Sequence, residues 1–391
     1  MKIGLLVGRE NTFPQAFIDY INAMALPDIT AEFCKLGGTR MGEPPEYRVI
    51  VDRISHEVPY YRAYLKNAVL QGAVVINDPF WWSTDDKYFE CCLSEKLGVA
   101  VPRTMVLPNK DYIPEITAES LRNLVAPLDW QSMLDYTGLP AILKPAIGGG
   151  WKNVSKVCNV EELVRAFDAG GQLLMILQEF IDFQQYVRCI CLGKHNIKVI
   201  PYNPLVPFAE RYAPDPHYLT PALHERVVHD AWTLCDALGY DMNTVEFAIR
   251  DGVPYAIDFL NPAPDFDSFS IKEENFQWVL ENLSRLVIAY ARGEASPWSP
   301  PGTTVPGHDY RWAHTLRGGE TAAGVLGAAV AEVGHTAVRA AEAVGAALKR
   351  GGHKKGAHDP GATPSPRAGE KAAKNTARRK KGDQAEDTVI G

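Results

Sequence analysis

Apolar residues recur along the first part of the chain in short runs that alternate with helical patterns. Runs typical of buried strands occupy Lys2–Gly8, Arg48–Ile54 and Gly72–Asp78, and a helical pattern covers Tyr60–Gln71. Strands that alternate with helices indicate a parallel sheet. We therefore expect a small parallel α/β domain at residues 1–83.

The middle of the chain contains further strand and helix patterns. A helix is predicted at Ser83–Gly98, with Ser83 as its N-cap, and another after Asn159, which forms a capping-box pattern with Glu162. The extended runs here are Val99–Pro108, Pro140–Pro145, Val154–Val157, Leu173–Ile181, Tyr186–Gly193 and Ile197–Asn203.

The strongest local signal is the hairpin pattern at Asn243–Asn261. Asp251-Gly252 lies between two apolar runs, and this dipeptide is typical of a tight hairpin turn. Helical periodicity precedes it at Leu219–Leu238 and follows it at Phe276–Gly293. Residues 84–295 are therefore expected to form the main domain.

The composition changes after residue 295. Residues 296–318 are rich in Pro and Gly and predict a linker, while residues 319–350 are rich in Ala and predict a helix. Residues 351–391 contain no aromatic side chain and are expected to be disordered. From Gly345 onward there are 11 Lys/Arg against 5 Asp/Glu, although the whole chain carries −7. The folded part is therefore acidic and the tail basic.

Composition narrows the class of protein. Of the 391 residues 46% are hydrophobic and 22% charged, as in an ordinary globular protein. No apolar run is long enough to predict a membrane span, and the N-terminus has the pattern of a strand rather than a signal peptide. Seven scattered cysteines without CxxC spacing argue against a disulfide framework or a zinc site. We expect a cytoplasmic protein.

Several charged and glycine-rich positions could carry chemistry, but each has a simpler interpretation. Lys144 at a strand end could be a surface lysine, and the glycines that follow could form only a turn. Glu246 and Asp258 could be surface acids, but the strands around them are apolar, and buried acids need a partner. A metal ion would be such a partner.

The order of these parts resembles the ATP-grasp superfamily, in the branch of glutathione synthetase and RimK-type carboxylate–amine ligases. The similarity covers about 2–293. It implies an α/β ATP-grasp fold after the small N-terminal domain, with two α+β lobes that sandwich ATP. The nucleotide lobe is expected at about 100–182 and the metal-binding lobe at about 183–295.

The resemblance assigns the triphosphate to Lys87 and Lys144, whose charges offset repulsion between phosphates. It assigns a mobile phosphate loop to Gly148, Gly149 and Gly150, whose backbone can approach the phosphates closely. Lys152 could add charge there or be a surface residue.

The resemblance also places adenine on the segment "LQEFI". Its implied contacts are Gln178, Glu179, Phe180 and Ile181. Relatives often hold the ribose with an acid shortly downstream, whereas this chain reads "DFQQYVRC". Gln184 or Gln185 would bind the ribose by hydrogen bonds instead, and we assign this role to Gln185.

The metal ligands implied by the resemblance are Glu246, Asp258 and Asn261. Their oxygens suit Mg²⁺, with Mn²⁺ as an alternative. Arg188 lies where the glutamate-ligase branch keeps an arginine that suits a carboxylate or an acyl phosphate.

Four further residues are weaker candidates for the cleft. Arg211 and Tyr212 lie on a loop that could face the acceptor. Arg53 and His56 would line the cleft from the N-terminal domain, or Arg53 could make only a local salt bridge.

The implied reaction is an ATP- and Mg²⁺-dependent ligation of a carboxylate to an amine through an acyl phosphate. Lys144 and Arg188 would be catalytic, and the substrates would be small molecules or peptides. The alternatives are an ATP-grasp kinase that stops at phosphoryl transfer and an ATP-binding scaffold without turnover. The basic tail could bind nucleic acid, solubilise the chain or tether an acidic partner, and the Ala-rich helix could support an oligomer.

Overall fold

The computed structural model describes residues 1–83, 86–148, 152–207, 210–212, 215 and 217–303. The chain divides into two compact units, Met1–His308 and Asp309–Gly391. The second unit lies outside the described residues. The predicted Ala-rich helix, the predicted tail and the linker beyond residue 303 therefore fall outside the described part.

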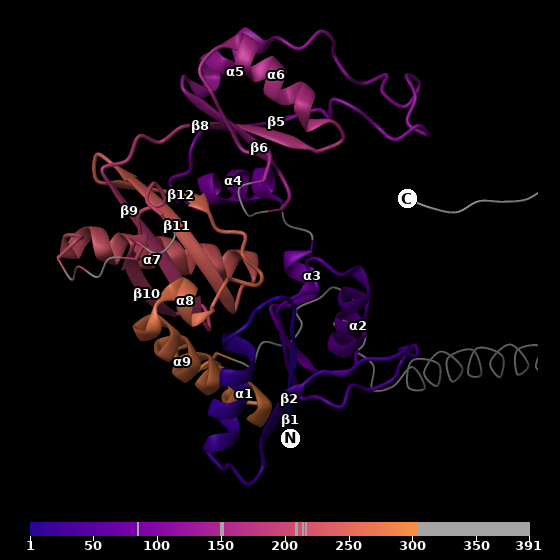
Figure 1. The fold of residues 1–391 in the computed structure, drawn as a ribbon, viewed down its shortest axis with the longest axis vertical. Coiled ribbons are helices and arrows are strands. Elements are labelled where there is room, and N and C mark those ends of the chain that lie inside the picture. Colours follow the sequence, from indigo (N-terminus) through magenta and orange to yellow (C-terminus); the bar gives the residue numbers. More distant parts are fainter. Residues whose placement is uncertain (84–85, 149–151, 208–209, 213–214, 216, 304–391) are drawn as a thin grey trace, which may run out of the picture. The chain divides into compact units, whose positions relative to one another are not determined.

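The first sheet is parallel, with strand order β2-β1-β3-β4 (Figure 1). Its strands are β1 (Lys2–Leu6), β2 (Thr30–Phe33), β3 (Val49–Asp52) and β4 (Val74–Ile76). Helix α2 (Pro59–Leu70) connects β3 to β4, as predicted. The sequence patterns missed β2 and helix α1 (Phe13–Ala23), although Phe13, Phe17 and Ile21 repeat at helical spacing and are buried.

The second sheet is antiparallel, with strand order β5-β8-β6-β7. Its strands are β5 (Thr104–Leu107), β6 (Ala141–Pro145), β7 (Ser155–Val157) and β8 (Met175–Glu179), and helices α5 (Trp130–Thr137) and α6 (Val160–Gly170) accompany it. Asn159 caps α6 as predicted, since its Oδ1 accepts from Glu162 N at 2.9 Å. The Glu162 carboxylate reaches back to Cys158 N at 2.8 Å, one residue before the usual position.

The third sheet is also antiparallel, with strand order β10-β9-β11-β12. Its strands are β9 (Gln185–Leu192), β10 (Asn196–Pro201), β11 (Met242–Arg250) and β12 (Val253–Asp258). The predicted hairpin turn is confirmed, with φ of +54° at Asp251 and +74° at Gly252. Helices α7 (Pro221–Leu238) and α9 (Glu273–Arg292) match the two predicted helices that flank the hairpin, and short helix α8 (Ser268–Ile271) precedes α9.

The helix that starts the main domain begins later than predicted. Helix α4 spans Lys87–Lys96, and its N-cap is Asp86, whose carboxylate accepts from the N–H groups of Tyr88 and Phe89. Ser83 instead follows the short helix α3 (Pro79–Trp82) as its C-cap. The sequence "STDD" contains several residues that favour N-cap positions. Its first residue, Ser83, ends α3, and the N-cap of α4 is the last one, Asp86.

Among the described residues, three hydrophobic clusters pack against these sheets. One joins the first sheet and α1 to α9 and one face of the third sheet, and a second fills the other face of the third sheet under α7. A third lies between the second sheet and helices α5 and α6. The third sheet is therefore covered on both faces, so a polar group at its centre needs partners within the protein or a ligand.

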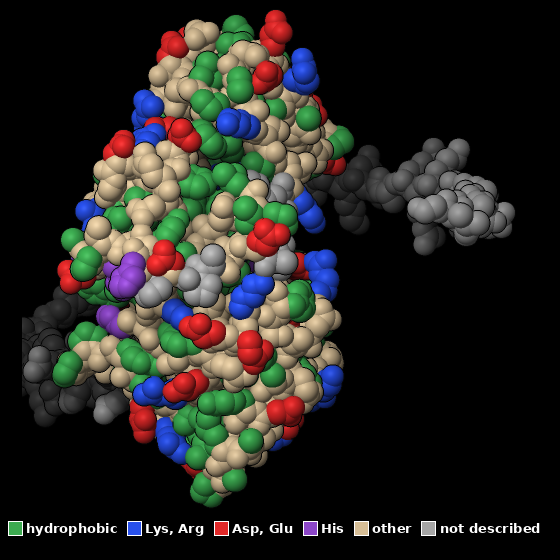
Figure 2. All heavy atoms as spheres, turned by 60° about the vertical axis from the view of Figure 1, so that its left-hand side comes forward, with side chains coloured by type: hydrophobic (Ala, Val, Ile, Leu, Met, Phe, Trp, Pro, Cys, Tyr) green, Lys and Arg blue, Asp and Glu red, His purple; other side chains and the backbone are tan. Residues whose placement is uncertain are grey.

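The surface of the described residues carries mixed charge. Acidic and basic side chains are interspersed with hydrophobic ones on the face drawn in Figure 2. In the part of the chain that is described, no helix has the length and apolar character needed to cross a membrane. All seven cysteines are free thiols.

Candidate active site

Three charged residues form a row across the third sheet. Arg188 of β9 pairs with Glu246 of β11, and Glu246 pairs with Asp258 of β12. Directly opposite residues on antiparallel strands point to the same face of the sheet. One guanidinium and two carboxylates therefore share a face.

A β-bulge brings Asp258 into this row. Phe247 pairs with Ala256, but Glu246 pairs with Asp258, so the register skips Ile257. In a regular ladder Asp258 would pair with Val245, whose side chain belongs to the cluster on the opposite face. Because side chains alternate between faces, the bulge decides which face Asp258 joins.

Glu246 is contacted by a tyrosine and an arginine. Tyr186 Oη donates to Glu246 Oε2 at 2.5 Å, and Arg188 Nε lies 3.7 Å from Oε1. Burial raises the pKa of Glu246; Arg188 lowers it, and Asp258 raises it, so that the net shift is upward. Additional positive charge would stabilise the ionised form of both carboxylates, and a divalent cation supplies it.

Arg188 is oriented from three sides. Its terminal nitrogens donate to Tyr212 Oη at 3.0 Å and to Thr244 Oγ1 at 3.3 Å. Its guanidinium carbon lies 5.6 Å from the centre of the Tyr202 ring. Among the described residues its buried Nε has no hydrogen-bond acceptor. An anionic ligand beside Glu246 would supply one.

The two predicted lysines approach the same region from other elements. Lys144 near the end of β6 donates to Ile257 O at 3.4 Å, and Lys87 at the start of α4 has its Nζ 4.0 Å from Asp258 Oδ1. Burial lowers the pKa of Lys144; Asp258 raises it and Lys87 lowers it, for a net decrease. The lysines thus converge on the acidic end of the row.

The start of the glycine loop lies at the same place. Gly148 has φ of +99°, and a Cβ added there would meet nothing within 4 Å. Its carbonyl accepts from Lys87 Nζ at 2.8 Å, while Lys87 N donates to Ala146 O at 3.0 Å. Gly149 and Gly150 lie outside the described residues, and Lys152 beyond them is exposed.

The side chains of Gln178 and Glu179 already have partners in the protein. Gln178 is buried, and its Nε2 donates to Thr104 Oγ1 at 2.9 Å. Glu179 accepts from Arg103 Nε at 2.9 Å and from Arg250 at 3.0 Å. Contact between Glu179 and a nucleobase would therefore have to use its backbone.

The rest of the predicted adenine segment connects β8 to β9. Lys156 Nζ lies 4.0 Å from the centre of the Phe180 ring, and Ile181 is buried. Gln185 is the first residue of β9, and its amide nitrogen donates to Tyr218 O. That contact uses one of the two N–H groups of the amide, so the other N–H group and the side-chain oxygen remain as polar groups for a ligand.

The carboxylates of Glu246 and Asp258 and the amide of Asn261 have oxygen atoms of the kind that magnesium prefers. Asn261 Nδ2 donates to Thr244 O at 3.0 Å, so its amide oxygen remains as the possible ligand atom. Carboxylate and amide oxygens are hard donors, and Mg²⁺ needs few of them because phosphates and water complete its shell. Among the described residues no cluster of three or more His, Cys, Asp or Glu offers a metal site of another kind.

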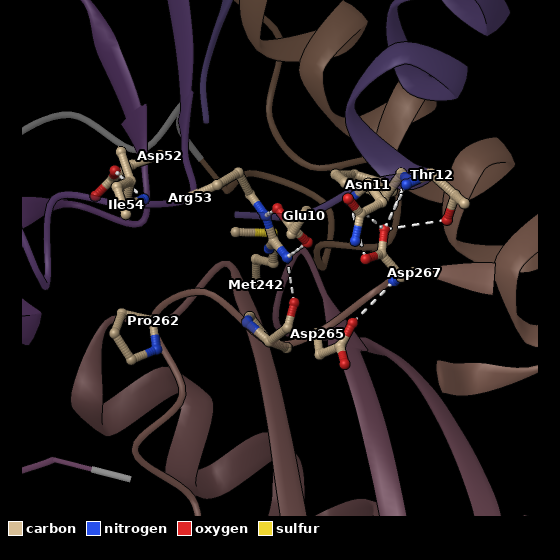
Figure 3. Close-up of polar contacts among 12 residues, drawn as sticks. Glu10, Asn11, Thr12, Asp52, Arg53, Ile54, Met242, Pro262, Asp265 and Asp267 are labelled. Atoms are coloured by element: carbon tan, nitrogen blue, oxygen red, sulfur yellow. Dashed lines mark hydrogen bonds and ion pairs between the residues drawn. The ribbon is translucent and has the colours of Figure 1, made fainter. Parts of the chain in front are cut away.

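Arg53 does not line a cleft. Its side chain is 1% exposed and paired with Glu10. Figure 3 shows it between Glu10 and Met242, and its guanidinium also donates to Pro264 O and stacks on Phe13 and Phe266. Arg53 therefore ties the end of β3 to the segment after β12. His56 nearby is exposed.

The sequence patterns missed several residues that shape this site. Tyr186 and Thr244 contact the charged row, and each lies two positions from a predicted residue on the same strand. The period of two along a strand could have indicated both. Arg103 and Arg250 gave no such signal, because their partner Glu179 lies far away in the sequence.

Comparison with curated proteins gives partial matches. The chain is 27% identical over 173 residues to a D-alanine–D-alanine ligase of Polynucleobacter asymbioticus, covering 40% of this chain and 51% of that protein. It is 24% identical over 187 residues to a D-alanine–D-alanine ligase of Ralstonia nicotianae, covering 43% and 53%. The chain thus spans about half the length of these relatives. No family model matches it.

Comparison with solved structures covers more of the fold. A D-alanine–D-alanine ligase from Bacillus anthracis complexed with ATP matches with a TM-score of 0.52 and 15% identity, over 75% of this chain and 97% of that one. A RimK domain ATP-grasp protein from Sphaerobacter thermophilus matches with a TM-score of 0.51 and 16% identity, over 73% and 98%. These likenesses confirm the predicted ATP-grasp fold. The chain therefore has the ATP-grasp fold, and its partial sequence matches are to D-alanine–D-alanine ligases.

Proposed function

We propose that this protein is an ATP- and Mg²⁺-dependent carboxylate–amine ligase that works through an acyl phosphate. The observation that carries the proposal is the convergence of two lysines on a carboxylate pair, with Arg188 at the other end of the same row. Phosphoryl transfer depends mainly on positioning and charge neutralisation, and this arrangement supplies both.

In the first step a carboxylate oxygen of the substrate attacks the γ-phosphorus of ATP, the bond to the β,γ-bridging oxygen breaks, and ADP leaves. Lys87 and Lys144 bind the triphosphate and neutralise its charge, and the backbone of Gly148, which accepts a hydrogen bond from Lys87, lies beside them. A bound Mg²⁺ would neutralise phosphate charge, held by Glu246, Asp258 and Asn261.

In the second step the amine nitrogen attacks the acyl carbon, the C–O bond to phosphate breaks, and the amine loses a proton as the amide forms. Arg188 orients the carboxylate and then the acyl phosphate, because its Nε is buried beside Glu246 without an acceptor in the described chain. A planar guanidinium matches both anions. Phe180, Ile181 and the backbone of Gln178 and Glu179 hold adenine, and Gln185 holds the ribose.

The free thiols suit a reducing compartment, so we place the reaction in the cytoplasm. The substrates are small-molecule or peptide carboxylates and amines. The related proteins that are named as D-alanine–D-alanine ligases support an amino acid as at least one of the two substrates.

The test is product formation with ATP, Mg²⁺ and a mixture of amino acids, followed by mass spectrometry and by ADP and phosphate release. We expect an amide product together with ADP and phosphate that depend on the amine. ADP release that never needs an amine, with a phosphorylated product, would replace the ligase with a kinase. Nucleotide binding without any turnover would indicate that the protein is an ATP-binding scaffold and not an enzyme.

A further inference from the structure

The segment that joins β8 to β9 is fixed at its first end by an ion-pair cluster. The two oxygens of Glu179 accept from different arginines, Arg103 of the same lobe at 2.9 Å and Arg250 at the end of β11 at 3.0 Å. Glu179 N also donates to Arg103 O at 2.9 Å. The carboxylate therefore links the second sheet to the third.

Arg250 is itself held in place. A terminal nitrogen donates to Tyr255 Oη at 3.3 Å, and its guanidinium carbon lies 4.9 Å from the centre of the Tyr255 ring. The side chains of Glu179 and Arg250 are 13% and 29% exposed. A partly buried pair with a stacked arginine is less screened and more ordered than a surface pair.

The other end of the segment is fixed to the same hairpin. Gln184 N donates to Ile249 O at 2.9 Å, and its side-chain oxygen accepts from Asp251 N at 2.9 Å. Residues 180–184 thus run between two anchors on the β11–β12 hairpin, one through Arg250 and one through Asp251. The backbone of this segment has little freedom to move away from the third sheet.

We infer that Arg250 is a positioning residue for the nucleobase, acting through Glu179 on the segment between β8 and β9. The inference rests on the proposed function, which places adenine on this segment. Because the arginines occupy both oxygens of Glu179, the segment offers its backbone to the base, and Arg250 sets where that backbone lies. The lysines at the phosphate end do not depend on this contact.

The inference is tested by measuring the affinities of ATP, adenosine and inorganic tripolyphosphate in the presence of Mg²⁺. We expect Arg250→Gln to weaken adenosine and ATP by about fivefold to tenfold while tripolyphosphate stays within about twofold. Glu179→Gln should give the same shift, and the double variant should be no weaker than either single one because the two residues act as a unit. Arg250→Lys should recover part of the loss, since it keeps the charge but not the planar fork.

Arg292→Gln is the matched control, because Arg292 also pairs with a carboxylate, Asp28 at 3.4 Å, on another part of the surface. It should leave all three affinities within about twofold. Unchanged adenosine binding in Arg250→Gln, or an equal loss of tripolyphosphate, would overturn the inference, as would a wild-type protein that binds no adenosine. If Arg250→Gln does not fold, Arg250→Lys and Glu179→Gln carry the same comparison. The measurement is of binding, not of turnover. A wild-type protein that binds adenosine but forms no amide would therefore contradict only the proposed ligase function and not the role of Arg250.

Discussion

Lys87 Nζ lies 4.0 Å from Asp258 Oδ1, and this contact joins the start of α4 to the end of β12. The same nitrogen donates to Gly148 O at 2.8 Å. Lys87 therefore lies between Gly148 and Asp258, which is where the proposed function places the triphosphate and its metal ion. A lysine held by a carboxylate and a carbonyl can transfer those contacts to phosphate with little movement.

Glu246→Gln should remove turnover while the fold stays intact. The substitution keeps the shape and the contact with Tyr186 but removes the charge that would hold Mg²⁺. We expect kcat to fall by at least about 100-fold, measured by amine-dependent ADP release over a Mg²⁺ titration. Glu274→Gln, which changes an exposed acid paired with Lys198, is the control. Wild-type turnover in Glu246→Gln would contradict the metal assignment.

Lys144→Met should weaken ATP through its phosphates. The substitution removes a buried positive charge and leaves Asp258 with one lysine fewer. We expect the Kd for ATP and for tripolyphosphate to rise together by about 10-fold to 100-fold with adenosine unaffected, as measured by calorimetry. Lys198→Met serves as a control, since that lysine pairs with Glu274 at 2.9 Å elsewhere. A loss confined to adenosine would place Lys144 at the other end of the nucleotide.

Asp267→Asn should destabilise the fold in a pH-dependent way. The buried Asp267 carboxylate accepts from the N–H groups of Asn11, Thr12 and Phe13 at 2.7 to 3.1 Å, and so caps α1 (Figure 3). Burial raises the pKa of Asp267, but these hydrogen bonds outweigh it, so the folded-state pKa lies below 3.8. We expect a loss of about 1–3 kcal/mol at pH 7, measured by urea denaturation.

The sign follows from the lowered pKa. The stabilisation by Asp267 is complete above its ordinary pKa of 3.8 and disappears as the pH falls through the lower folded value. The difference between wild type and Asp267→Asn should therefore shrink in acid. Asp28→Asn, at an exposed ion pair, should show neither effect. A constant difference at every pH would indicate lost packing rather than lost charge.

Asp78→Asn should stabilise the protein at neutral pH. Burial is the main cause that raises the pKa of Asp78 from 3.8 to about 6, and Asp241 adds to it. The folded state therefore binds the proton more tightly, and the wild type loses stability as the pH rises from about 4 to about 6. The amide can still cap Phe80 N without a charge, so we expect a gain of about 1–2 kcal/mol at pH 7, measured by thermal denaturation.

The control for Asp78→Asn is Asp129→Asn. Asp129 also caps a helix, with Ser132 N at 3.0 Å, but it is exposed. The neutral-pH gain should be absent there. Equal stability of Asp78→Asn and wild type at pH 7 would show that Asp78 is ionised in the folded protein at no cost.

Local signals in the sequence were sufficient where neighbours along the chain decide the structure. The Asp251-Gly252 turn was predicted correctly because both residues tolerate positive φ, and Asn159 caps its helix through the next turn. Helix α1 was missed for the opposite reason. Thr12 gives it no side-chain cap, and the cap comes from Asp267 near the other end of the described chain.

The sequence by itself determined which charges are available and on which strands they lie: Lys144 near a strand end, Arg188 in an apolar strand, Glu246 and Asp258 in a hairpin. Only the tertiary structure decided how they meet. Because the register skips Ile257, Asp258 lies on the same face of the sheet as Glu246. Arg103 and Arg250 bind the carboxylate of Glu179. The reason is physical: strand register alternates faces with every residue, and contacts between distant segments depend on how the sheets pack, which no local pattern encodes.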